Sequence, residues 1–196
     1  IEVGQGSPVK NAKWIWYPEG NPAIAAPVGY RFFRRLVVLD AAREVAAARM
    51  AMTADNRFEL WVNGQRAGAG EDANQLFRMD VTRWLKPGTN LLAVAGFNAH
   101  DEPNPASLIG ALSVQFHDGG ALELNTDGQW ESAVTAPDRW RDDAASSGWR
   151  AAMEVGPLGT EPFPVPEQTR PPAYVFPDFG AITNVLAQMG VPPDFE

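Results

Sequence analysis

Apolar and polar positions alternate over many short segments of the chain, which is the pattern of half-buried β-strands. In Phe58–Val62 every second side chain is apolar, and the segment ends at Asn63-Gly64. This pair favours a tight hairpin, because both central residues of a type I′ turn need a positive φ. A second alternating segment precedes the turn at Asp118–Gly120. Its side chains expected on one face are Leu108, Gly110, Leu112, Val114 and Phe116.

Other short segments rich in β-branched and aromatic residues predict further strands. They are residues 14–17, 30–39, 46–54, 65–68, 77–81, 91–97 and 121–124. The alanine-rich stretch 41–52 could also form a helix, but the flanking hairpins favour a strand. Trp14 and Trp16 alternate, so they are expected on one face. The pattern predicts an all-β fold, an antiparallel β-sandwich of the jelly-roll type.

The end of the chain has a different character. Nine of the 17 prolines lie from Pro157 onward, whereas the tryptophans all lie between Trp14 and Trp149. We therefore expect a β-sandwich domain over residues 1–156 and a Pro-rich linker over residues 157–196. Apolar residues at helical spacing predict one short helix in this extension. They are Ile182, Val185, Leu186 and Met189.

Charge and composition exclude several classes of protein. The net charge of -8 argues against nucleic acid as a partner, because phosphate contacts need a basic surface. No apolar run is long enough to cross a bilayer, so no membrane partner is expected. The absence of cysteine excludes disulfides, thiolate metal sites and cysteine nucleophiles.

Strand parity locates the polar loops. Successive antiparallel strands reverse direction, so alternate loops fall at the same end of a sandwich. Counting from the first strand places the loops 18–29, 55–56, 70–75, 98–107 and 125–130 at one end, with the tight turns opposite. A sugar needs partners for its hydroxyls and an aromatic face for its C–H surface, and these loops carry both. The candidate ligand-binding residues are Tyr17, Asp55, Asn56, Arg57, Asn98, His100, Asp101, Glu102 and Trp130.

Each candidate has a plainer explanation. The cluster at residues 98–102 could be a solvated connection, and Trp130 could pack in the core rather than stack on a sugar. No cofactor is expected, although acidic side chains of these loops could hold a structural Ca²⁺ ion. The acidic candidates are Asp55, Asp72, Asp101, Glu102 and Asp127. A carboxylate pair among them could also serve a glycosidase, while no serine-hydrolase motif is present.

Several motifs occur in a recognisable order: KWIW at 13–16, TADNRFELWVNGQRAG at 53–68, MDVTRWLKPGTNLLAV at 79–94, FHDGG at 116–120, LNTDGQW at 124–130 and GWRAA at 148–152. Together they resemble the galactose-binding-like jelly-roll domains of bacterial carbohydrate-active enzymes. The likeness is to the sugar-binding domain of glycoside hydrolase family 2 and to the N-terminal domains of bacterial α-L-rhamnosidases. It covers roughly residues 12 to 160.

The resemblance implies a non-catalytic carbohydrate-binding module. Its expected partners are a neutral poly- or oligosaccharide and the other domains of a larger polysaccharide-processing protein, secreted or periplasmic. An alternative is a structural domain that docks on a catalytic or electron-transfer domain of the same protein. A glycoside hydrolase is a third hypothesis, since fold alone does not fix function.

Overall fold

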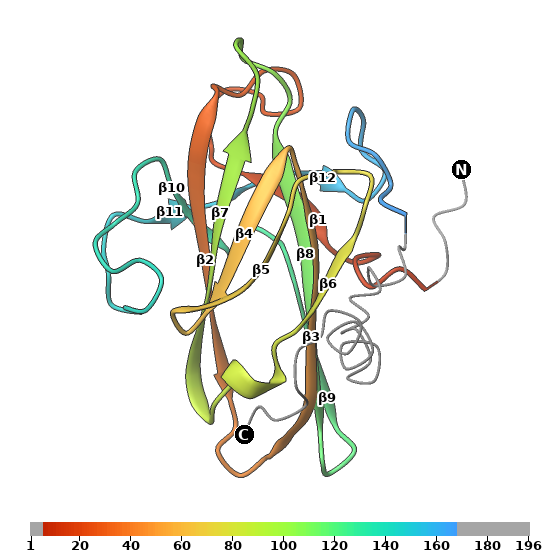
Figure 1. The fold of residues 1–196 in the computed structure, drawn as a ribbon, viewed down its shortest axis with the longest axis vertical. Coiled ribbons are helices and arrows are strands. Elements are labelled where there is room, and N and C mark those ends of the chain that lie inside the picture. Colours follow the sequence, from red (N-terminus) through yellow and green to blue (C-terminus); the bar gives the residue numbers. More distant parts are fainter. Residues whose placement is uncertain (1–5, 168–196) are drawn as a thin grey trace, which may run out of the picture.

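Residues 6–167 are described by the computed structural model, and they form two β-sheets packed face to face (Figure 1). One sheet, here called the β8 sheet, has the strand order β12-β1-β8-β3-β6, with β9 paired to the rest of β8. The other, the β7 sheet, has the order β11-β10-β2-β7-β4-β5. Neighbouring strands are antiparallel throughout both sheets. The all-β sandwich is therefore confirmed.

The elements follow one another along the chain with short connections. They are β1 (Lys13–Trp16), β2 (Gly29–Leu39), β3 (Val45–Asp55), β4 (Arg57–Val62), β5 (Gln65–Gly70), β6 (Phe77–Asp80), the 3₁₀ helix η1 (Thr82–Trp84), β7 (Gly88–Asn98), β8 (Ser107–Phe116), β9 (Ala121–Asn125), β10 (Glu131–Ala133), β11 (Arg150–Ala151) and β12 (Met153–Pro157). The alanine-rich stretch is strand β3, as predicted. Strands β10, β11 and β12 were not predicted, because segments of two to five residues carry little periodicity.

The main core lies between the two sheets. Phe58, Leu60 and Val62 of β4 point into it and are fully buried. The predicted face of β8 is buried there too, opposite the apolar side chains of β2 and β7. The alternation in the sequence therefore identified both core-facing sides correctly.

Trp14 and Trp16 do not share a face, although they alternate along β1. Trp16 lies in the core between the sheets, whereas Trp14 belongs to a second cluster on the outer face of the β8 sheet. The pairing of β1 with β12 shifts register between Trp14 and Ile15. The extra residue of this bulge is Val155 of β12, and in β1 the consecutive residues Ile15 and Trp16 both lie in the core. Strict alternation therefore fails along this strand, which is why the prediction was wrong.

The folded body extends beyond the predicted boundary at residue 156. That position falls inside β12, which pairs with β1 along its whole length. Leu158 and Phe163 are buried in the outer cluster, where the Phe163 ring lies 5.0 Å from that of Trp14. Glu167 then bridges to Gln75. The short helix predicted at residues 182–189 lies outside the described residues.

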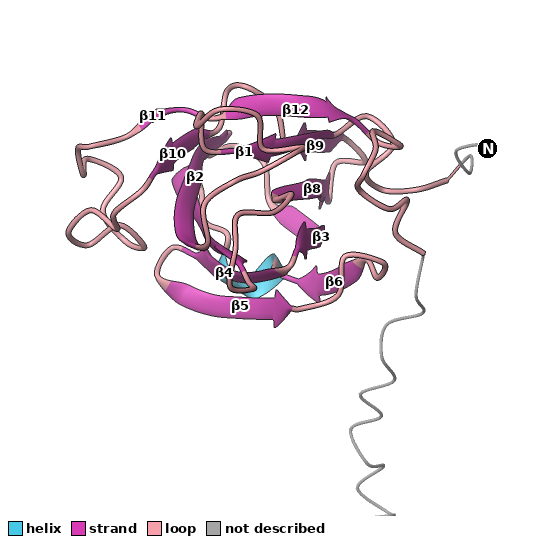
Figure 2. Cartoon of the chain, turned by 90° about the horizontal axis from the view of Figure 1, so that it is seen from above, coloured by secondary structure: helices cyan, strands magenta, loops and turns pink. Residues whose placement is uncertain are grey.

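A third cluster covers the outer face of the β7 sheet. The connection between β10 and β11 projects from one side of the sandwich (Figures 1 and 2). Its Trp140 packs edge-on against Trp61 of β4 and Phe32 of β2. Within residues 6–167 the chain forms no helix of the length and apolar character that would span a bilayer.

Candidate functional site

Four loops meet at one end of the sandwich, here called the apex. Gly29 at the start of β2 lies opposite Asn98 at the end of β7, and Arg57 lies opposite Phe97. On the other sheet Asp55 lies opposite Ser107. The loops 18–28, 71–76 and 99–106 and the turn at residues 55–56 therefore share this end, as strand parity predicted.

The fifth loop is elsewhere, so the parity count was wrong for residues 125–130. Asn125 pairs with Ala111 and Glu131 with Arg34, which are positions in the middle of β8 and β2. The loop crosses between the sheets at mid-height. Trp130 is 1% exposed, lies in the core, and donates its indole N–H to the Asn125 carbonyl at 3.0 Å. Its ring is covered by protein and cannot stack on a sugar.

Asn56 ties the turn after β3 to the end of β7. The side-chain oxygen of Asn56 accepts the backbone N–H of Ala99 at 2.7 Å, and the backbone N–H of Asn56 donates to the Phe97 carbonyl at 3.2 Å. The peptide bond between Asp55 and Asn56 is cis. These two hydrogen bonds bring the 55–57 and 97–99 segments together, so these predicted site residues form one cluster.

Asn98 is the buried centre of this cluster. Its amide nitrogen donates to the Ala26 carbonyl at 2.9 Å and to the Asn104 carbonyl at 3.3 Å, which joins the two long apex loops. The side chain is 0% exposed, and its Oδ1 has no hydrogen-bond partner among the described residues. A buried acceptor without a partner is costly, so it marks a place where a ligand atom would be favourable.

Asp55 is a partly buried carboxylate in the same cluster. Its Oδ1 accepts the side-chain N–H of Asn56 at 2.9 Å, and it forms no ion pair within residues 6–167. Burial raises the pKa of Asp55, and the nearby His100 partly offsets that rise. Its negative charge is therefore poorly compensated by the protein.

The tip of the 99–106 loop is polar and exposed. His100 has a positive φ of 84°, and Asp101 and Glu102 project into solvent. The side-chain amide of Asn104 holds the loop from inside by donating to the carbonyls of Ala99 and Glu102 at 2.8 and 2.9 Å. The charge of His100 acts on Asp55, so His100 lies beside the Asp55–Asn98 cluster, and Asp101 and Glu102 follow it at the exposed tip of the loop.

Arg57 contacts two aromatic residues beside the apex that the sequence did not identify as candidates. Its guanidinium donates to the Tyr30 hydroxyl at 2.7 Å and lies 5.2 Å from the centre of the Phe97 ring. Tyr30 is 43% exposed. Only loop residues were considered as candidates, whereas these two rings are at strand ends. Tyr30 and Phe97 lie near the ends of β2 and β7, at positions whose side chains alternate to the outer face of the sheet. This alternation could have identified them as candidates from the sequence.

Tyr17 is held in a different set of contacts. Its hydroxyl accepts a hydrogen bond from Arg150 at 3.1 Å, and its ring lies near the guanidinium of Arg31 at 6.0 Å. Arg31 is itself paired with Glu19 at 2.6 Å. No contact between described residues links Tyr17 to the Asp55–Asn98 cluster.

The acidic loop residues do not gather around a common point. Asp72 accepts hydrogen bonds from Asn74 in its own loop, and Asp127 accepts the Gln129 N–H in the mid-height loop. In the described part of the chain no three His, Cys, Asp or Glu side chains lie close enough to share a metal ion. Any cation at the apex would therefore depend on amide and carbonyl oxygens as well as Asp55.

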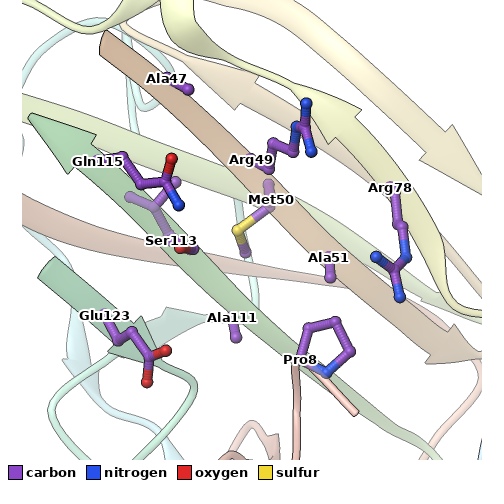
Figure 3. Close-up of a pocket in the computed structure, with 11 residues that line it drawn as sticks. Pro8, Ala47, Arg49, Met50, Ala51, Arg78, Ala111, Ser113, Gln115 and Glu123 are labelled. Atoms are coloured by element: carbon purple, nitrogen blue, oxygen red, sulfur yellow. The ribbon is translucent and has the colours of Figure 1, made fainter. Parts of the chain in front are cut away.

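A separate cavity of about 310 Å³ opens on the outer face of the β8 sheet (Figure 3). Small side chains of β3 and β8 form its floor, and charged and polar side chains surround them. None of the apex residues lines it. The residues drawn there include Pro8, Ala47, Arg49, Ala51, Arg78, Ala111, Ser113, Gln115 and Glu123.

Comparison with known proteins gives the fold a context. No protein-family model matches the chain. The sequence is 34% identical over 163 residues to the α-L-rhamnosidase of Streptomyces avermitilis, which covers 79% of this chain and 15% of the enzyme. A crystal structure of the Streptomyces avermitilis α-L-rhamnosidase complexed with L-rhamnose superposes with a TM-score of 0.74 at 30% identity. That match covers 82% of this chain and 16% of the enzyme chain.

A lectin from Pleurotus ostreatus in complex with GalNAc also has a TM-score of 0.74, at 27% identity. It covers 83% of this chain and 47% of the lectin chain. The chain is thus an all-β sandwich similar to one part of a rhamnosidase and to about half of a lectin. It spans about one sixth of the enzyme, and the likeness is to a carbohydrate-binding or non-catalytic module within a larger protein.

Proposed function

We propose that this chain is a non-catalytic carbohydrate-binding module, and that its apex binds a neutral poly- or oligosaccharide. The proposal rests on the Asp55–Asn98 cluster. Asp55 has a carboxylate whose charge the protein compensates poorly, and Asn98 has a buried oxygen without a hydrogen-bond partner in the described chain. The parent protein is proposed to be a larger polysaccharide-processing protein, secreted or periplasmic. The rhamnosidase complexed with L-rhamnose and the lectin in complex with GalNAc support this class of ligand.

The apex offers both kinds of contact that a sugar requires. Asp101 and Glu102 can accept hydrogen bonds from hydroxyls, and the free N–H groups of Arg57 can donate to them. Exposed apolar side chains border the same loops and can contact C–H groups. They are Ile24 and Val28, exposed by 69% and 38%.

The cluster also fits a Ca²⁺ ion, which we propose as part of the site. The oxygens that would hold it are the Asp55 carboxylate and Asn98 Oδ1, because Ca²⁺ prefers oxygen ligands and these two lack compensating partners. A bound Ca²⁺ ion would supply coordination positions for sugar hydroxyls. Asn98 would then act through the ion, since its own side chain is fully buried.

Calorimetric titration of the 196-residue chain tests the proposal. The ligands are L-rhamnose, GalNAc and a panel of neutral polysaccharides, each measured with CaCl₂ and with EDTA. We expect binding that falls sharply in EDTA and in Asp55→Asn. Asp127→Asn is the matched control, because its carboxylate lies away from the apex and the new amide keeps the acceptor for Gln129. No binding to any member of the panel would contradict the proposal.

A docking role is the second candidate, and the cavity on the β8 sheet is the observation that favours it. Its rim carries Arg49, Gln115 and Glu123 above a floor of alanines, a surface that a neighbouring domain of the parent protein could cover. Gln115→Lys, at an exposed position of this rim, should then lower the melting temperature of the parent protein and leave that of the isolated chain unchanged. An equal effect in both would contradict docking at this face.

A further inference from the structure

Tyr30 presents an aromatic ring on the outer face of the β7 sheet, directly beside the apex. Tyr30, Phe97 and Arg57 lie opposite one another on β2, β7 and β4 and form one row of outward side chains. Gly29 and Asn98 are the next pair toward the apex. Successive residues of a strand are about 3.3 Å apart, so the row begins where the proposed sugar site ends.

The Tyr30 ring is held rigidly although it is exposed. Its centre lies 4.7 Å from that of Phe97 and 6.2 Å from that of Phe32, nearly parallel to the latter at 18°. Its hydroxyl accepts a hydrogen bond from Arg57 at 2.7 Å. An aromatic ring fixed before binding loses little conformational entropy when a ligand stacks on it.

The next outward row of the sheet bounds this surface. Glu59 of β4 lies opposite Ala95 of β7, and both face outward like the Tyr30 row. Ala95 is 6% exposed and belongs to the third cluster, and the half-buried Glu59 forms an ion pair with Arg66 at 3.3 Å. The row continues to Phe32, whose ring centre lies 5.0 Å from that of Trp140. A ligand on the exposed Tyr30 ring is therefore directed toward the apex rather than along this row.

We propose that Tyr30 forms a second sugar position, which stacks the neighbouring residue of an oligosaccharide whose first residue occupies the apex. This inference rests on the proposed function and adds to it the ligand class: a neutral glycan of at least two residues, with a pyranose C–H face for the ring. Pyranose faces and aromatic rings pair through the apolar surface that each exposes. Arg57, which already contacts the Tyr30 hydroxyl, is the polar partner of this second residue.

The experiment compares sugars of increasing length. Titrations use L-rhamnose and GalNAc, and then disaccharides and trisaccharides that carry the same sugar at the non-reducing end. Stacking adds about tenfold in affinity at most for one aromatic contact. We expect the oligosaccharide to bind about tenfold more tightly than the monosaccharide, and Tyr30→Ala to remove that gain without changing monosaccharide affinity.

Three further variants make the outcome unambiguous. Tyr30→Phe keeps the ring and should keep most of the gain, while Tyr30→Leu keeps apolar area without a ring and should lose it. Val38→Ala is the matched control, an exposed residue on the same face of β2 at the far end. Two outcomes would overturn the second position alone. One is that oligosaccharides bind no more tightly than the monosaccharide, and the other is that Tyr30→Ala lowers the affinity for both equally. Absence of any sugar binding would instead overturn the proposed function.

Discussion

Two side chains at the apex carry an energetic cost that the rest of the fold does not explain. Asn98 leaves an acceptor buried without a partner, and Asp55 keeps a partly buried carboxylate without an ion pair in the described chain. Folded proteins rarely keep such groups without a compensating role. The cation proposed above would relieve the cost at Asp55 and at Asn98, so stability is a measurable consequence of the proposed site.

Asp55→Asn is expected to stabilise the protein when no cation is bound. Burial raises the pKa of Asp55, so the folded state binds this proton more tightly than the unfolded state does. The cost of the buried charge is therefore present above the folded pKa and disappears as the pH falls below the ordinary value of about 4. In EDTA the variant should melt above the wild type at pH 7 and at the same temperature near pH 3. A difference that does not change with pH would contradict this explanation.

Asn98→Ala is expected to lower the free energy of unfolding by about 1.5 kcal/mol, since it removes the hydrogen bonds that join the two long apex loops. The carbonyls of Ala26 and Asn104 still accept each other's backbone N–H in the variant, which limits the loss of stability. Urea denaturation measures it. Asn74→Ala, an exposed apex residue, is the control and should stay within about 0.5 kcal/mol of the wild type. Equal losses in the two variants would contradict the structural role of Asn98.

At the scale of elements, one arginine organises the connection between β10 and β11. Arg34 of β2 forms an ion pair with Glu131 at 2.6 Å and donates to the carbonyl of Ser146 at 3.0 Å. Its guanidinium also stacks on Trp149 at 4.6 Å. A connection with little regular structure is thus fixed to the sheet by one buried arginine in addition to the packing of Trp140.

Arg34→Ala should lower the free energy of unfolding by about 2 kcal/mol. The value is below that for a fully buried pair, because the Glu131 side chain is 41% exposed. Limited proteolysis should cut within residues 134–149 faster than in the wild type. Arg139→Ala removes an exposed ion pair of the same connection and should leave both readouts unchanged. Unchanged cleavage in Arg34→Ala would mean that the connection is held by its tryptophans instead.

The long strands could be predicted from the sequence because each buries one face, and alternation records that directly. Phe58–Val62 is the clearest case. Prediction failed where a local irregularity decides the outcome. Alternation fails within β1, beside the shift in its register to β12, and nothing in KWIW indicates it. Strands β10, β11 and β12, which were not predicted, depend on partners that are distant in the sequence, and periodicity does not detect these.

Counting strands predicted which loops lie together at the apex, but not how their side chains pack. Residues of the 55–57 and 98–102 segments do lie together, because antiparallel pairing places alternate loops at one end. Trp130 was misplaced, since the mid-height crossing between sheets breaks the count. The unpaired oxygen of Asn98 and the exposed ring of Tyr30 are consequences of three-dimensional packing, so only the structure could identify them.

At the scale of the whole molecule, the two ends of the described chain meet on the outer face of the β8 sheet. Val9 and Trp14 from the beginning pack with Leu158 and Phe163 from the end. These contacts cover a sheet face that would otherwise expose Ile109 and Ala111. Residues 157–167 therefore act as part of the sandwich, and their loss should unfold it rather than release a tether.

Phe163→Ala tests this view of the molecule. The ring is 4% exposed and packs on Trp14, so its removal should lower the free energy of unfolding by about 3 kcal/mol. Val165→Ala, two residues further along and 38% exposed, should cost less than about 0.5 kcal/mol. Thermal and urea unfolding of both variants measure the difference. If Phe163→Ala melts like Val165→Ala, the segment after β12 is a linker and the folded body ends with β12. If only Phe163→Ala loses much of the free energy of unfolding, the folded domain extends beyond residue 163. Such a loss is expected only for a residue that unfolds together with the core.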